Sequence, residues 1–165
     1  MHPFIDIPFT EYDTLLFEVH AMKNNEIESY QPYGQLAVEL PAAPPCYTNM
    51  QARLIGHTPN TGLTVTFPVV ESYTNPAGSM QGGYITAAFD NVFGPLCYRA
   101  SGTGSSAMVD INTSFHRPVF PGDELTITAR VKAKGKRIIH MEGEAYNREN
   151  KLVASASCDY MITGA

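Results

Sequence analysis

Four consecutive segments in the second half of the chain alternate between apolar and polar residues. They cover residues 107–115, 125–133, 137–147 and 152–162. Alternation with a period of two gives each strand one buried and one wetter face, which is typical of an antiparallel sheet. Pro121-Gly122-Asp123 and Lys134-Gly135-Lys136 separate neighbouring segments by the short, turn-forming sequences that hairpins or meanders need. Residues 63–70 also alternate, and Pro68 within them predicts an edge position or a bulge because it cannot donate a ladder hydrogen bond.

Residues 80–98 follow a different period. Their apolar side chains recur every three or four residues, as in an amphipathic helix: Ile85, Ala88, Phe89, Val92, Phe93 and Leu96. This is the most apolar helix in the chain, so we expect the sheet to wrap around it. Pro95, after Gly94, should bend the last turn or end the helix early. Strand periodicity begins at about residue 50, which leaves room for one further strand before residues 63–70. The order of two strands, a long helix and four strands predicts an α+β domain with one antiparallel six-stranded sheet on a central helix.

The first 45 residues differ from the rest and form an N-terminal extension. Thr10-Glu11-Tyr12-Asp13 resembles a capping box, and the apolar spacing after it predicts a helix over residues 11–23. A linker containing Pro41, Pro44 and Pro45 follows. We therefore divide the chain into an extension, residues 1–45, and one sheet domain, residues 46–165.

Composition argues against several classes of partner. A net charge of −5 gives little electrostatic support for binding nucleic acid. The start of the chain shows no basic segment followed by an apolar run, and no stretch is long enough to cross a bilayer, so we expect a cytoplasmic protein without a membrane partner.

The metal-ligating residue types are scattered. Cys46, Cys97 and Cys158 are widely spaced and include no C-x-x-C pair, so three buried thiols in a reducing compartment are the expectation. The five histidines share no metal-ligand spacing, and the sequence therefore predicts neither a metal nor a separate cofactor.

Two glycines at the start of the long helix are the first candidate for chemistry. Gly82 and Gly83 let another molecule approach the backbone closely. Their amides have no partner inside the helix and carry partial positive charge. Such amides suit a carbonyl oxygen that becomes negative during nucleophilic attack. A tight turn that needs glycine for steric reasons explains the same residues.

Asp90 is the second candidate, because a carboxylate within the most apolar helix is costly unless it is hydrogen-bonded or faces a cavity. The alternative is a place on an exposed stripe of the helix. Gly83 and Asp90 are seven residues apart and share one face, but about 10 Å separates them along the axis. If both serve one reaction, Asp90 must meet the glycines of a second subunit, which predicts an isologous dimer with two shared sites.

This stretch resembles the signature of the PaaI-type acyl-CoA thioesterases of the hotdog superfamily. The pattern is Asn-x-x-Gly-x-x-His-Gly-Gly, six residues and Asp, and here it runs from Asn75 to Asp90. Residues 109–115 and 117–123 also resemble the family's third strand and the turn after it. The resemblance covers the chain from about residue 50 to its end.

The resemblance implies a hotdog fold and hydrolysis of an acyl- or aryl-acyl-CoA thioester by a homodimer or a dimer of dimers. Asp90 would activate water as a general base or attack as a nucleophile. Gly82 would offer its amide to the thioester oxygen. Asn75 would order the loop or hydrogen-bond near the same carbonyl, although an asparagine before Pro76 is also an ordinary turn residue. Coenzyme A is then part of the substrate and no cofactor is implied.

Two positions depart from the family pattern. Gln81 stands where the family usually has His, and its amide can still donate a hydrogen bond, so we expect a weakened or retuned site rather than an inactive one. Met108 stands where some relatives place Ser or Thr near the attacking water, with Ser106 close by. These departures favour one rival reading, a non-catalytic acyl-CoA binding protein on the same fold. A hotdog hydratase or dehydratase ranks lower, because those enzymes generally rely on a catalytic His paired with an acidic residue and the central helix carries no His.

Coenzyme A also carries phosphates, which need cations. The densest basic group in this acidic chain is Arg117, Lys134, Lys136 and Arg137. These residues are candidates for contacting the nucleotide, and ordinary solvated hairpin charge explains each of them equally well. Phe89, Phe93 and Tyr84 are candidates for lining the acyl pocket, which core packing explains just as well.

Overall fold

The structure, a computed structural model, describes residues 44–163, so the predicted helix over residues 11–23 and most of the Pro-rich linker lie outside the described residues. The elements follow in chain order: α2 (Pro45–Asn49), β1 (Arg53–Thr58), β2 (Gly62–Pro68), the 3-10 turn η4 (Glu71–Tyr73), α3 (Gly82–Ser101), β3 (Ser106–Phe115), β4 (Glu124–Lys134), β5 (Ile138–Tyr146) and β6 (Leu152–Ile162).

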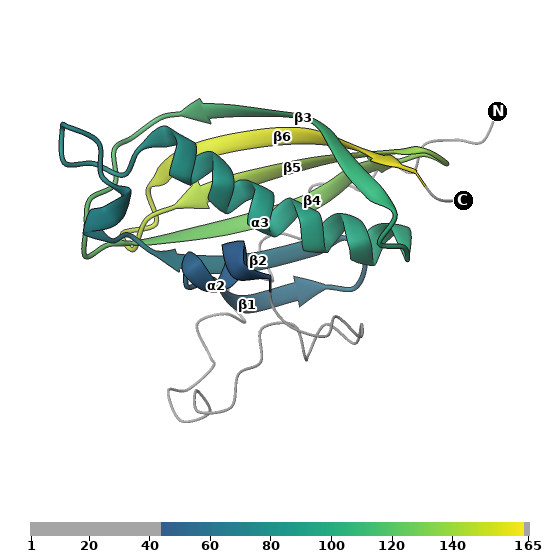
Figure 1. Cartoon of the computed structure of the whole chain (residues 1–165), viewed down its shortest axis with the longest axis horizontal. Helices are drawn as coiled ribbons and strands as arrows, with labels where there is room; N and C mark the ends of the chain where they lie inside the picture. Colours follow the sequence, from purple (N-terminus) through teal and green to yellow (C-terminus); the bar gives the residue numbers. More distant parts are fainter. Residues whose placement is uncertain (1–43, 164–165) are drawn as a thin grey trace, which may run out of the picture.

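The strands form one antiparallel six-stranded sheet in the order β1-β2-β4-β5-β6-β3, and α3 lies across its concave face (Figure 1). The predicted α+β arrangement is therefore confirmed. After α3 the chain crosses to the far edge of the sheet. Among residues 44–163, β3 pairs only with β6, and its other edge is open. Because α3 and β3 follow one another in the chain, the helix runs antiparallel to this open strand.

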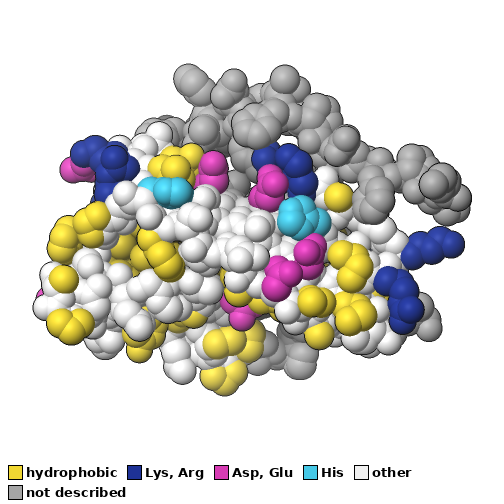
Figure 2. All heavy atoms as spheres, turned by 90° about the horizontal axis from the view of Figure 1, so that it is seen from above, with side chains coloured by type: hydrophobic (Ala, Val, Ile, Leu, Met, Phe, Trp, Pro, Cys, Tyr) yellow, Lys and Arg dark blue, Asp and Glu magenta, His cyan; other side chains and the backbone are white. Residues whose placement is uncertain are grey.

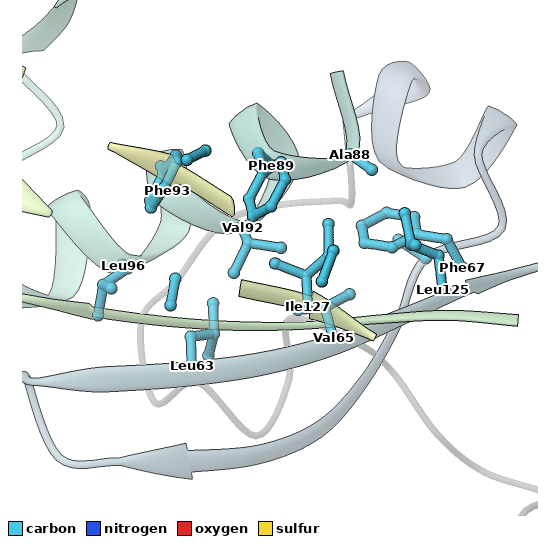
Figure 3. Packing of buried hydrophobic residues seen from close by; sticks show 14 of the residues in the cluster. Leu63, Val65, Phe67, Ala88, Phe89, Val92, Phe93, Leu96, Leu125 and Ile127 are labelled. Carbon is cyan, nitrogen blue, oxygen red and sulfur yellow. The ribbon is translucent and has the colours of Figure 1, made fainter. Parts of the chain in front are cut away.

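The core lies between α3 and the sheet (Figure 3). Phe89 and Phe93 are fully buried, with ring centroids 5.9 Å apart. A Cβ on Gly143 of β5 would lie 3.2 Å from the ring of Phe89 and 3.3 Å from that of Phe93, so this glycine makes room for both rings. The two phenylalanines are thus core residues, whereas Tyr84 is 38% exposed.

Of the two effects predicted for Pro95, a bent last turn or an early end, the early end does not occur. Helix α3 continues to Ser101 and stops at Gly102, whose φ of 75° lies in the left-handed region and whose amide donates to the Tyr98 carbonyl. Buried residues on both sides of the proline hold the helix on the sheet: Val92, Phe93, Leu96, Cys97 and Ala100. Their burial outweighs the one helical hydrogen bond that a proline removes.

The edge position or bulge predicted from Pro68 is wrong, because β2 lies between β1 and β4 and its pairing with β4 has no register shift. Pro68 is its last residue and lies beyond Thr66, where the pairing with β1 ends, so the missing amide faces no partner strand on that side. Thr64 and Thr66 are buried although they alternate with the core residues, so β2 lacks the wetter face that its sequence predicts.

The expectation of three buried thiols was wrong for Cys46, which is exposed, whereas Cys97 and Cys158 are buried. Within residues 44–163, no helix combines the length and apolar character needed to span a membrane.

Candidate active site

The loop before α3 is built around Asn75. Its side-chain carbonyl accepts the Ala77 amide at 2.9 Å, and its side-chain amide donates to the Ser79 hydroxyl at 3.1 Å. Its backbone amide donates to the Ser79 carbonyl, and Gly78 closes the turn with a φ of 77°. The structure thus places the Asn75 side chain inside its own loop, where it can order the backbone.

Backbone hydrogen bonds then hold the start of α3 in place. The Met80 amide donates to the Val119 carbonyl and the Gln81 amide to the Tyr73 carbonyl, each at 2.8 Å. Gln81 is the N-cap, and its carbonyl accepts the amides of Tyr84 and Ile85. In the described part of the chain, the amides of Gly82 and Gly83 donate no hydrogen bond. Two donors at the positive end of a twenty-residue helix are therefore open to an external acceptor.

A side chain at either glycine would crowd a neighbouring side chain. A Cβ on Gly82 would lie 2.9 Å from Cζ of Phe115, which is closer than real Cβ contacts. A Cβ on Gly83 would lie 3.0 Å from Oε1 of Gln81, whose exposed side chain lies along the helix start. The steric explanation and the amide-donor explanation of the two glycines are thus compatible.

Asp90 lies two turns further along α3, eight residues and about 12 Å from Gly82. It is exposed, as on a solvent-facing stripe, and it is also hydrogen-bonded: the Tyr160 hydroxyl of β6 donates to Oδ1 at 3.2 Å. Among the described residues no group bonds to Oδ2. One carboxylate oxygen is therefore held and the other is available to a substrate or a water.

Three contacts show that this helix face follows β3. Gly82 abuts Phe115, the Thr86 hydroxyl donates to the Thr113 hydroxyl at 3.1 Å, and the Cys97 thiol lies 3.6 Å from the Ser106 hydroxyl. Gly82 and Asp90 thus both lie at the open edge of the sheet.

Met108 pairs across β3 and β6 with Tyr160, the residue that donates to Asp90, whereas the Ser106 hydroxyl accepts a hydrogen bond from the Cys97 thiol. The edge itself carries exposed apolar side chains, with Val109 57% and Phe115 54% exposed. Figure 2 looks onto this side of the molecule and shows apolar groups with acidic and histidine side chains between them.

The four basic candidates do not gather in one place within a single chain. Lys136 and Arg137 are exposed in the β4–β5 turn, beside Lys134, whose Nζ donates to the Ala100 carbonyl at the end of α3. Arg117 donates to the Leu152 carbonyl at the first residue of β6, whereas the Arg137 carbonyl accepts an amide at the last residue of that strand. The length of β6, about 30 Å, separates the two groups.

The described residues offer little support for a cysteine nucleophile or a metal site. Burial raises the pKa of the Cys158 thiol, as it does that of Cys97, so neither is poised as a thiolate nucleophile. In residues 44–163 no three His, Cys, Asp or Glu side chains are grouped as metal ligands. Tyr160 was not among the site residues predicted from the sequence, although the alternation in residues 152–162 puts its side chain on the inner face, where a hydroxyl needs a partner.

One antiparallel sheet wrapped around one long helix, with a glycine-led helix start and a carboxylate two turns later, defines a hotdog protein. Residues 77–154, just under half of the chain, match the family model described as thioesterase superfamily. The acyl-coenzyme A thioesterase PaaI of Escherichia coli K12 is 34% identical over 91 residues, which cover 54% of this chain and 63% of that protein. Human acyl-coenzyme A thioesterase 13 is 32% identical over 89 residues, covering 52% and 62%.

Solved structures of similar fold point to the same group of proteins as the sequence matches. A thioesterase related to phenylacetic acid degradation from Ralstonia eutropha JMP134 superposes with a TM-score of 0.69 at 26% identity, covering 81% of this chain and all of that one. Over the matched residues 77–154 the chain is similar to the thioesterase superfamily, and it resembles the PaaI-type members. It spans less than two thirds of the length of the curated relatives that it matches.

Proposed function

We propose that this chain hydrolyses an acyl- or aryl-acyl-CoA thioester to the free acid and CoA. The observation that carries the proposal is the pairing, at one open edge, of free helix-start amides at Gly82 and Gly83 with an exposed carboxylate at Asp90. Relatives over the matched region include a protein named acyl-coenzyme A thioesterase PaaI. The Gly82 amide would hold the carbonyl oxygen as it becomes negative, and Asp90 would activate water or attack the carbonyl carbon itself.

The site would be shared between two subunits. About 12 Å along α3 is too far for Gly82 and Asp90 of one chain to reach one carbonyl. Gly82 lies beside Phe115, and Asp90 is held by Tyr160, the cross-strand partner of Met108. If two β3 strands pair antiparallel about a point between Ile111 and Asn112, Phe115 of one subunit lies opposite Met108 of the other. Each Asp90 then meets the other subunit's Gly82, in a homodimer with two equal sites.

Such a dimer would also bring the basic residues closer together. The antiparallel arrangement carries Arg117 of each subunit toward the end of the sheet where the other subunit has Lys136 and Arg137. These three cations would then be available to the phosphates of one CoA, whereas Lys134 is engaged by the end of α3. We further propose that the protein works in the cytoplasm, as a homodimer or a dimer of dimers, because three unpaired cysteines suit a reducing compartment.

Two routes use the same groups. In the first, Oδ2 of Asp90 takes a proton from water, the hydroxide adds to the carbonyl carbon, and the C–S bond breaks as the thiolate takes the proton from Asp90. In the second, Oδ2 itself adds to the carbon, the thiolate leaves, and water hydrolyses the mixed anhydride. Each route consumes one water and returns Asp90 to its ionised form.

The rival function is acyl-CoA binding without turnover. Two residues favour it, because Gln81 brings no imidazole to the helix start and Met108, opposite Tyr160, brings no hydroxyl. A binding module would hold a thioester tightly and would not depend on Asp90.

Thiol release from short, long-chain and aryl acyl-CoA esters separates the two functions. We expect wild-type protein to release thiol, and Asp90→Asn, which changes one oxygen to an amide, to lower kcat by about a thousandfold or more with the fold intact. Asp159→Asn is a matched control, since Asp159 is an aspartate on the outer face of β6 that pairs with His140. Asp90→Asn activity within about threefold of wild type contradicts the assigned role, and binding without release supports the rival.

A further inference from the structure

Tyr160 contributes to the Asp90 environment in a way that no motif of the sequence indicates. Its residue is 6% exposed, and its hydroxyl donates the one hydrogen bond that the Asp90 side chain receives from the described residues. A Cβ on Gly94, one turn after Asp90, would lie 3.5 Å from the hydroxyl oxygen. The phenol therefore lies against the helix surface at Gly94 and reaches Asp90 from the side of the sheet.

Among residues 44–163, the Tyr160 hydroxyl is the one that bonds to the Asp90 side chain. Met108, opposite Tyr160 on β3, has a thioether, and the Ser106 hydroxyl is bonded to Cys97. Burial raises the pKa of Tyr160, and the nearby charge of Asp90 raises it further. The phenol thus stays protonated and donates a hydrogen bond to the carboxylate.

We propose that Tyr160 is a positioning residue for the thioester hydrolysis proposed above. It holds Oδ1 of Asp90, so that the carboxylate cannot rotate and Oδ2 faces the substrate. In both routes the proton or the new bond forms at Oδ2, and Tyr160 keeps its own proton throughout. Orientation of this kind acts on the rate of the chemical step and leaves CoA binding alone.

The test compares thiol release by wild type, Tyr160→Phe and Tyr146→Phe. Tyr146 is the matched control because its hydroxyl also donates to a carboxylate, that of Glu144 on the outer face of β5. We expect Tyr160→Phe to lower kcat about tenfold with KM unchanged, and Tyr146→Phe to leave both unchanged. Phenylalanine keeps the buried ring, and thermal unfolding checks that both variants fold.

Adding Tyr160→Phe to Asp90→Asn gives the second readout, measured in single turnovers with enzyme in excess. If Tyr160 acts through Asp90, the double variant is no slower than Asp90→Asn alone. An equal further loss in that background shows a structural role and overturns the proposal. A second result also overturns the proposal: Tyr160→Phe keeps the wild-type kcat, while the wild type turns over and Asp90→Asn does not. Absence of turnover in the wild type overturns the proposed function and this inference together.

Discussion

The contact between Phe115 and Gly82 leaves no room for a side chain at the helix start. The tip of the phenylalanine ring would lie 2.9 Å from a Cβ on Gly82, and the ring is otherwise more than half exposed at the sheet edge. Any residue larger than glycine must therefore displace either the helix start or the ring. Because the amide of Gly82 is the proposed donor to the thioester oxygen, a shift of the helix start acts directly on the chemistry.

Gly82→Ala is expected to lower kcat/KM about a hundredfold, since losing one oxyanion donor costs this much or more. Adding Phe115→Leu should recover part of the loss because the shorter side chain gives the new methyl group space. Steady-state thiol release gives kcat/KM for both variants. Full activity in Gly82→Ala alone, with the fold intact, contradicts the role of this amide.

At the scale of elements, the end of α3 is stabilised from outside the helix. Gly102 stops the helix, and the Lys134 amine of β4 donates to the Ala100 carbonyl in the last turn. A cation near the end of a helix offsets the partial negative charge of its free carbonyls. Lys134 therefore connects α3 to β4, whereas Lys136, two residues further on, is exposed in the turn.

We predict different effects for these two lysines. Lys134→Met should lower the free energy of unfolding by up to about 1 kcal/mol, because it removes the contact with the helix end. Lys136→Met should leave stability unchanged and raise KM for the CoA ester, more so at low salt. Thermal unfolding and KM at two ionic strengths distinguish them. Equal stability losses in the two variants contradict the assignment of Lys134 to the helix end.

For the molecule as a whole, the sequence predicted what local periodicity determines. The strand expected over residues 125–133 spans Glu124–Lys134, and the one over residues 152–162 matches Leu152–Ile162. Features that depend on packing between distant segments were not predictable in this way. Pro95 stays helical because the buried residues around it rest on the sheet, and the bond from Tyr160 to Asp90 joins residues seventy positions apart. The basic residues look clustered in sequence, yet the length of β6 separates them.

The open edge of β3 leads to a last prediction, on the shared site. Asp90→Asn and Gly82→Ala are each expected to be nearly inactive as homodimers. In a heterodimer of the two variants, one site combines both substitutions and the other combines wild-type Asp90 from one chain with wild-type Gly82 from its partner. Because a two-fold dimer has two equal sites, the purified heterodimer should recover about half of the wild-type kcat.

Co-expression of the two variants with different affinity tags, followed by purification on both tags, isolates the heterodimer. Its thiol release is compared with that of each parent homodimer at the same subunit concentration, and sedimentation confirms the assembly state. Activity no higher than the mean of the two parents means that Gly82 and Asp90 act within one chain or through another interface. Recovery of half the activity requires that the carboxylate and the amide come from different subunits, because neither variant chain carries both.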